Sequence, residues 1–350
     1  MRRVSTIVLK WMLGAIAITV AVVVVLCLIP IEPTISPLKP RTTTQYWSMS
    51  KGYRIAYTRA SPGLESGLPP IVFLHGGPGG YVHSSTISLL SGLTELGYSV
   101  YFYDQAGCGL SDRLAKPKDY SFFGHVDDLR EIITDHIGAS KVILIGHSYG
   151  GQLAAQLTAM YPGLVAKLVL SSPGELQPSN WENGEWVNLS KYPKPDTLEF
   201  VATERAKMDG VRFWTMRGMA TMALAMLNIK LMSDAEADGL LNNLASRFTA
   251  NMVCDSTHIL PEEGGAGFYA HGWSNFYGDL EDPRPLMQAC QVPVLVLQGE
   301  CDYIPYVATF EYAALFPDSH YEFIENAGNI IWWDQPGDYF CRIIDFLDEK

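Results

Sequence analysis

Short, continuous runs of hydrophobic residues alternate with longer amphipathic stretches along most of this chain. The runs are typical of strands that are buried on both faces, and they predict strands at 70–74, 99–103, 141–145 and 166–171. The stretches between them have helical spacing and predict helices at roughly 85–97, 122–137 and 149–161. Buried strands separated by helices indicate a mostly parallel sheet covered by helices on both faces.

A long interruption divides this pattern. Further elements are predicted on either side of it: a hairpin at 46–49 and 53–59, strands at 294–297 and 320–324, and a closing helix at 336–348. Residues 176–284 carry helical patterns without parallel-strand runs. We therefore predict one core domain in two parts, 46–175 and 285–350, with a helical lid inserted over the carboxyl ends of the strands.

The N-terminus carries a different hydrophobic pattern. An unbroken apolar run covers residues 11–29, close to the length of about 20 residues that crosses a bilayer. It is preceded by basic residues, namely Arg2, Arg3 and Lys10. This arrangement predicts a signal anchor at 1–31 and a proline-containing tether at 32–45, with the N-terminus in the cytoplasm and the core outside. A cleaved signal peptide, giving a secreted protein, and a buried globular helix are the alternatives.

Composition narrows the class of protein. Hydrophobic residues make up 48% and charged residues 18% of the 350 positions, as in a globular protein. The net charge of −12 argues against nucleic acid as a partner. The six cysteines show no C-x-x-C or metal-site spacing, and Cys290 with Cys301 is one possible pair outside the cytoplasm.

The segment Gly146-His147-Ser148-Tyr149-Gly150 lies between a predicted strand and a predicted helix. Gly-x-Ser-x-Gly in this context is a nucleophile elbow, in which the two glycines allow strand and helix to approach across a sharp turn. The hydroxyl of Ser148 is then lifted above the sheet. The pattern predicts a serine hydrolase.

A glycine-rich loop, residues 75–80, directly follows the predicted strand that ends at Leu74. Acyl transfer requires N–H groups that point at the developing oxyanion. We expect the backbone N–H groups of Gly77 and Tyr149 to provide this oxyanion hole.

Two further loops follow predicted strands. Residues 103–112 have no evident chemical step to perform, and we expect them to form a structural turn. Cys108 within this turn is a weak nucleophile candidate, because no histidine neighbours it in a recognisable arrangement. Residues 298–305 contain Glu300 and Asp302. Asp302 is the favoured triad acid because it lies at the far end of the turn, nearest the expected base.

These motifs together resemble the proline iminopeptidase family of α/β-hydrolases, in its tricorn-interacting-factor and amino-acid-amidase-like branch. The match is carried by His-Gly-Gly-Pro-Gly, Tyr-Asp-Gln-x-Gly-Cys-Gly-x-Ser and the Ser-Tyr-Gly-Gly elbow. The resemblance implies an α/β-hydrolase fold and release of N-terminal residues, often proline, from short peptides or amides. It also implies acidic lid residues that hold the substrate's amino group, for which Glu182, Glu185 and Glu204 are candidates, although solvated charges are the alternative.

The expected catalytic base is replaced. The family closes its triad with Ala-Gly-His, whereas this chain has Ala327-Gly328-Asn329, at 27 residues after Asp302 (329 − 302). An asparagine amide has no useful basicity near neutral pH and cannot accept the serine proton. Loss of a triad base costs roughly 10⁶ in turnover in a comparable enzyme.

Another histidine is the first possible replacement. His83, His258 and His271 could reach the pocket from loops or the lid, whereas the remaining five are expected to shape the backbone or lie elsewhere. Otherwise Asn329 is an engineered change, a natural loss in a ligand-binding pseudohydrolase, or part of an enzyme with a rearranged or substrate-assisted base.

The sequence therefore predicts a membrane-anchored serine aminopeptidase or amidase with Ser148, Asp302 and position 329 as its triad, and with low activity in this chain. Its expected substrate is a small peptide or an aminoacyl amide, and no metal or organic cofactor is implied. An esterase or thioesterase of the same fold and a non-catalytic pseudohydrolase are the alternatives.

Overall fold

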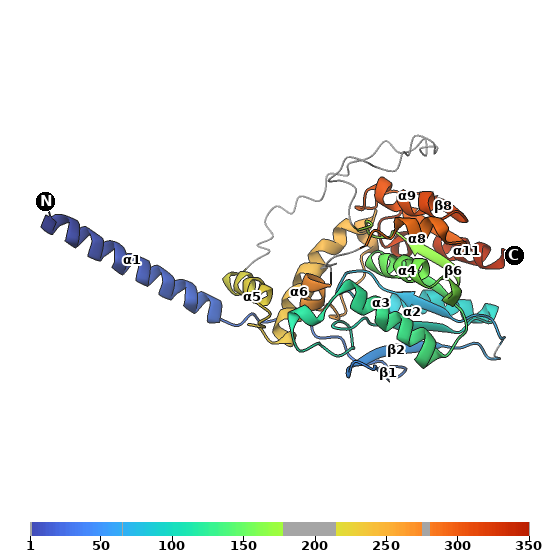
Figure 1. Ribbon diagram of the computed structural model, residues 1–350, viewed down its shortest axis with the longest axis horizontal. Coiled ribbons are helices and arrows are strands. Elements are labelled where there is room, and N and C mark those ends of the chain that lie inside the picture. Colours follow the sequence, from blue (N-terminus) through green and yellow to red (C-terminus); the bar gives the residue numbers. More distant parts are fainter. Residues whose placement is uncertain (1, 65, 178–214, 275–280, 350) are drawn as a thin grey trace.

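The computed structural model describes residues 2–64, 66–177, 215–274 and 281–349, with side chains from residue 10 onward. Its core is one eight-stranded sheet in the order β1-β2-β4-β3-β5-β6-β7-β8 (Figure 1). The strands are β1 Gln45–Ser48, β2 Arg54–Ala60, β3 Ile71–Leu74, β4 Val100–Tyr103, β5 Val142–His147, β6 Val165–Ser171, β7 Val294–Gly299 and β8 Ser319–Ile324. Only the β1–β2 and β2–β4 pairs are antiparallel, so the predicted hairpin and mostly parallel sheet are confirmed.

Helices cover both faces of this sheet. They are α2 Ser84–Leu90, α3 Phe122–Glu131, α4 Tyr149–Met160, α8 Arg284–Ala289, α9 Tyr306–Leu315, α10 Ile331–Asp334 and α11 Pro336–Asp348. The helix predicted at 85–97 is α-helical only through residue 90 and continues as a 3-10 helix, Ser91–Leu96. The one predicted at 122–137 ends in a π-helical turn, Ile132–Ile137.

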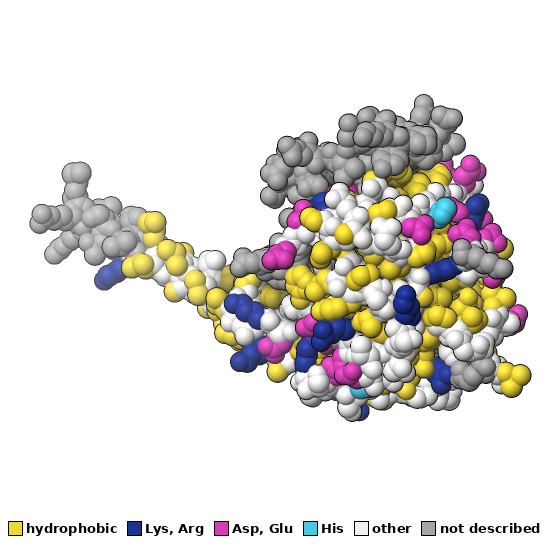
Figure 2. All heavy atoms as spheres, turned by 45° about the vertical axis from the view of Figure 1, so that its right-hand side comes forward, with side chains coloured by type: hydrophobic (Ala, Val, Ile, Leu, Met, Phe, Trp, Pro, Cys, Tyr) yellow, Lys and Arg dark blue, Asp and Glu magenta, His cyan; other side chains and the backbone are white. Residues whose placement is uncertain are grey.

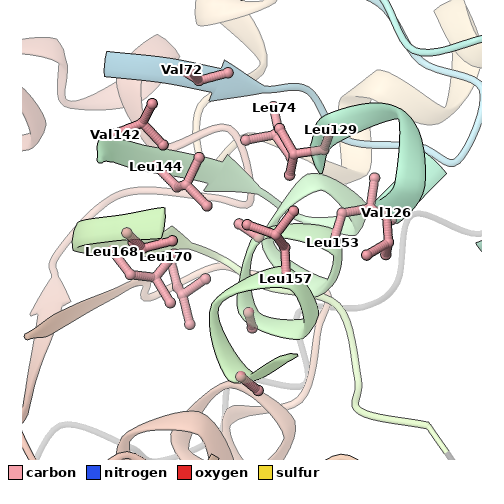
Figure 3. Packing of buried hydrophobic residues seen from close by; sticks show 14 of the residues in the cluster. Val72, Leu74, Val126, Leu129, Val142, Leu144, Leu153, Leu157, Leu168 and Leu170 are labelled. Atoms are coloured by element: carbon pink, nitrogen blue, oxygen red, sulfur yellow. The ribbon is translucent and has the colours of Figure 1, made fainter. Parts of the chain in front are cut away.

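Alternating side chains of each strand supply two cores. Val72 and Leu74 of β3 face the cluster formed with α3 and α4, while Ile71 and Phe73 face the opposite cluster. In Figure 3 leucines of α4 lie against β5 and β6, and side chains of α3 pack beside them. Successive residues of a strand point into opposite cores. Because both cores are hydrophobic, these strands are apolar throughout.

The described part of the inserted segment is helical. It contains α5 Met216–Met226, α6 Asp234–Phe248 and α7 Phe268–Trp273, which enclose their own small hydrophobic cluster. Residues 178–214 lie outside the described part, and with them the candidate acids Glu182, Glu185 and Glu204.

The N-terminal helix α1, Arg2–Leu28, projects away from the domain (Figure 1). Within the described residues, its segment Lys10–Leu28 is the one helix that is long and apolar enough to cross a membrane, and none of it is buried against the domain. A signal sequence meets the same criteria. Hydrophobic side chains lie along the described part of this helix (Figure 2), which is consistent with an N-terminal membrane-spanning helix.

The described cysteines form one disulfide, between Cys254 of the lid and Cys301 of the core. The possible pair of Cys290 with Cys301 is wrong, because Cys290 is a free thiol buried beside α4. The actual bond joins two segments 47 residues apart in sequence and lies immediately before Asp302.

Candidate active site

Ser148 lies in a strained turn between β5 and α4. Its backbone has φ 51° and ψ −118°, a region that a residue with a side chain rarely adopts, and it is 4% exposed. A Cβ at Gly146 would lie 2.5 Å from the Gly150 carbonyl oxygen, and one at Gly150 would lie 2.3 Å from the Leu74 carbonyl oxygen. Both glycines are therefore required for this close approach, as in the predicted elbow.

The glycine-rich loop after β3 lies beside the elbow. Leu74 pairs with Gly146 in the parallel register of β3 and β5, which brings the two loops together at one edge of the sheet. A Cβ on Gly76 would lie only 3.0 Å from the Cβ of Ser148. This places the loop where an oxyanion hole is expected, and the assignment of the Gly77 and Tyr149 N–H groups stays a prediction.

His75 stabilises this loop through hydrogen bonds of its imidazole ring. Its Nδ1 donates to the Gly76 carbonyl at 2.8 Å, and its Nε2 accepts the Gln105 N–H at 3.0 Å. Burial lowers the pKa of His75 to about 3, so the ring is neutral. Contrary to the sequence-based expectation, His75 Nε2 lies near Cys108, 3.6 Å from its Sγ, but burial raises the pKa of that thiol well above its usual value. Cys108 is therefore a buried thiol and not a nucleophile.

Asp302 follows β7 and points toward position 329. Its Oδ1 accepts the Ile304 N–H and the Asn329 Nδ2–H, both at 2.9 Å. Burial raises the pKa of Asp302 to about 6, against the opposing effect of these hydrogen bonds and of the nearby Ser172 hydroxyl. Asp302 Oδ2 and Ser172 Oγ are close, yet within the described part of the chain neither has a partner in hydrogen-bond geometry.

Asn329 is fully buried between two side chains. Besides donating to Asp302, it accepts from His147, whose Nε2 lies 3.1 Å from both the backbone oxygen and the Oδ1 of Asn329. Burial lowers the pKa of His147 to about 4, so the ring is neutral and Nε2 carries the donated proton. The carboxamide of Asn329 thus has a donor on one side and an acceptor on the other.

Asp334 holds the Asn329 loop in place and was not identified from the sequence as a site residue. Its carboxylate accepts the N–H groups of Gly328 and Cys254 at 2.8 Å, and His258 Nδ1 lies 2.8 Å from it. The signal was present in the Asp-Gln-Pro sequence after Asn329. Asp334 is a positioning residue that ties the loop to the lid.

Tyr303 is a second residue that sequence reasoning missed. Its hydroxyl lies near the side chain of Ser148, and loss of hydration at this hydroxyl raises the pKa of Tyr303 to about 12, although the residue as a whole is 38% exposed. The phenol is protonated at neutral pH and cannot serve as the missing base. The sequence offered no signal beyond its position next to Asp302.

The candidate replacement histidines are engaged elsewhere. His83 contacts the Pro261 carbonyl, His258 contacts Asp334 and His271 Nδ1 contacts the Pro78 carbonyl. In the part of the chain that the structure describes, none of the eight histidines is hydrogen-bonded to the Ser148 hydroxyl. Among the described residues, the nucleophile turn therefore has no histidine base beside it.

Comparison with known proteins agrees with this geometry. Residues 69–336 match the α/β-hydrolase fold family, so the chain belongs to that family of proteins. Within it, its similarity to proline iminopeptidases, drawn above from sequence motifs, is confirmed. The enzyme of Heyndrickxia coagulans is 28% identical over 291 residues, which is 80% of this chain and 90% of that protein.

A shorter sequence match is to another proline iminopeptidase, and a match to a solved structure supports the fold. The proline iminopeptidase of Saccharolobus solfataricus is 41% identical over 102 residues, 29% of this chain and about a third (32%) of that protein. Among solved structures, the esterase EaEST of Exiguobacterium antarcticum superposes with a TM-score of 0.59 at 18% identity, over 87% of this chain and 99% of that one. This last similarity concerns the fold alone.

Proposed function

We propose that this hydrolase is built as a serine aminopeptidase or amino-acid amidase, and that Asn329 leaves it with little turnover. The observation that supports this most directly is the hydrogen bond from Asn329 Nδ2 to Asp302 Oδ1 at 2.9 Å. A triad acid orients its histidine through a bond of this kind. Asparagine thus occupies the place of the base while the acid and the elbow are retained.

The chemistry follows from the groups present. Ser148 would attack the carbonyl carbon of an aminoacyl amide or short peptide, and the expected N–H groups of Gly77 and Tyr149 would stabilise the negative charge on its oxygen. Among the residues that the structure describes, the serine proton has no basic acceptor, since Tyr303 is protonated and Asn329 is not basic. Attack is therefore expected to be slow, because without a base the serine proton is not passed on to the leaving amine.

The test restores the base. Asn329→His is assayed against a set of aminoacyl amides and esters, beside the parent chain and Asn329→His/Ser148→Ala. We expect a gain of about 10³-fold or more in serine-dependent hydrolysis, with preference for amides that carry a free amino group. Preference for simple esters would support the esterase alternative.

A non-catalytic binding protein is the second candidate. The full burial and two-sided hydrogen bonding of Asn329 favour it, because the site is satisfied without a base. If Asn329→His gains nothing while the parent binds aminoacyl amides by calorimetry, the binding function replaces the catalytic one. Full serine-dependent activity of the parent would instead overturn the proposal that the base is missing.

We also propose that α1 is an uncleaved anchor with the catalytic domain on the extracytoplasmic side. The basic residues before the apolar helix support this topology, and a disulfide in the domain is typical of an oxidising compartment. Release of the full-length chain into the soluble fraction without detergent would contradict anchorage, and a shortened N-terminus would indicate cleavage.

A further inference from the structure

The lid helix α5 presents an apolar stripe to solvent. Its outward positions recur at helical spacing, and each carries an apolar side chain: Met216, Met219, Ala223, Met226 and, at the end of the helix, Leu227. Met226 and Leu227 are 66% and 68% exposed. The opposite face is buried through Gly218, Thr221 and Ala225. Surface helices of soluble domains have the reverse pattern, with the polar face outward.

This stripe begins where α1 meets the domain. Cys27 Sγ lies 3.7 Å from the Met216 carbonyl oxygen, and Arg217 Nη1 donates to the Cys27 carbonyl at 2.8 Å. The N-terminal end of α5 is thus at the level of the last turn of the apolar helix. Figure 1 shows α5 beside the domain end of α1.

An ion pair on the domain side of α5 fixes this junction. Glu236 of α6 binds Arg217 through both carboxylate oxygens, at 2.5 and 2.7 Å, and accepts the Ile31 N–H at 2.9 Å. The same carboxylate therefore ties the chain just after α1 to the base of α5. Two charged groups are engaged with each other and the backbone on the domain side, which leaves the outward face of α5 apolar.

We propose that the outward face of α5 lies in the bilayer interface, as a second membrane contact beside α1. This inference rests on the proposed anchorage. If α1 crosses the membrane, its last turn lies near the boundary of the hydrocarbon core, and residues held at that level meet the headgroup and acyl-chain region. An amphipathic helix with an apolar stripe is the element that binds there. The lid is thereby held against the membrane at α5.

The test uses the full chain in nanodiscs of phosphatidylcholine and phosphatidylglycerol with a small fraction of photoactivatable phosphatidylcholine. After irradiation, lipid-labelled peptides are located by mass spectrometry. We expect labelling of α1 and of residues 216–229. The label on residues 216–229 should be about tenfold higher than that on the loop containing Leu64, a leucine that is 87% exposed but lies outside α5. Met226→Glu/Leu227→Glu should reduce labelling of α5 severalfold and leave that of α1 unchanged, and Leu64→Glu should change neither.

The outcomes separate the two proposals. Labelling of α1 with residues 216–229 at the level of the Leu64 loop would overturn the contact at α5 and leave the anchor intact. Absence of label on both would overturn the anchor itself. Cross-links from α5 to α5 of a second copy, formed by a bifunctional reagent in place of the lipid label, would show that another chain covers the stripe.

Discussion

Ser148 separates two halves of the site that differ in what holds them. On the oxyanion side, the elbow and the glycine loop are fixed by backbone packing so tight that Gly146 and Gly150 admit no Cβ. On the acid side, Asp302, Asn329 and His147 are linked by side-chain hydrogen bonds, and a disulfide and Asp334 hold their loops. The oxyanion side has the tight turn of a nucleophile elbow, and the acid side is equally ordered around a residue that cannot transfer a proton.

If the proposed function is right, order and catalytic competence are separate properties of this site. Asn329 is buried and fully engaged, so its loop does not need a histidine in order to fold. The charge of Asp302 has no imidazolium to stabilise. Under the proposed function we therefore expect its role in this chain to be structural until a base is supplied, and this can be tested by removing the same acid in two backgrounds.

The largest expected effect concerns Asp302→Asn in the presence and absence of a histidine at 329. In the Asn329→His background we expect kcat/KM to fall roughly 10³- to 10⁴-fold, because an asparagine at position 302 favours the wrong tautomer of the histidine at position 329. In the parent, the same change should alter the residual rate less than about tenfold. Glu300→Gln, which removes the neighbouring carboxylate in the same turn, is the matched control. Equal losses in both backgrounds would show that Asp302 does not act through residue 329.

The second effect tests how the acid side is held. Replacing Cys254 and Cys301 by serine opens a link across 47 residues, and we expect the free energy of unfolding to fall by about 4 kcal/mol or less. Denaturant unfolding of the parent and of the double variant, each with and without reductant, measures this. Cys341→Ser removes an exposed free thiol and should leave the midpoint unchanged. A parent protein insensitive to reductant would mean that this bond contributes little to the folded state.

The third effect tests the oxyanion side. Gly150→Ala would place a Cβ 2.3 Å from the Leu74 carbonyl oxygen, and because these contacts are backbone atoms, neither partner can yield easily. We expect a loss of about 2–3 kcal/mol in unfolding free energy, as for other overpacked interiors. Gly163→Ala adds the same methyl group in open space and should be nearly neutral. A neutral Gly150→Ala would mean that β3 and α4 can separate without cost.

Local patterns predicted the oxyanion side better than the acid side. Continuous apolar runs located β3, β5 and β7, and the Gly-x-Ser-x-Gly motif located the elbow, because each of these signals depends on residues close in sequence. The acid side depends on long-range contacts. Nothing near Cys301 in the sequence indicates Cys254 as its partner, and the contact of Asp334 with the N–H group of Cys254 joins residues 80 positions apart.

The smallest effect concerns the acid side and is the dependence of the free energy of unfolding on pH. Burial raises the pKa of Asp302 from 3.8 to about 6, so between about pH 4 and 6 the folded protein binds more protons at this site than the unfolded chain. The contribution of Asp302 to stability therefore falls as pH rises through this window, on the order of 2 kcal/mol in total. His147 has a lowered pKa of about 4 and acts in the opposite direction, with stability gained as pH rises from about 4 toward 6.5.

Because His147 is present in both proteins, the difference in unfolding free energy between the parent and Asp302→Asn isolates Asp302. We expect the parent to lose stability relative to the variant from pH 4 to pH 6, and the difference to be constant above pH 7. Denaturant unfolding at closely spaced pH values measures it, with Glu300→Gln as the control for removing a carboxylate. Parallel stability curves for parent and variant would mean that Asp302 ionises without penalty, and a solvated acid side of that kind would remove the contrast between the two halves of the site.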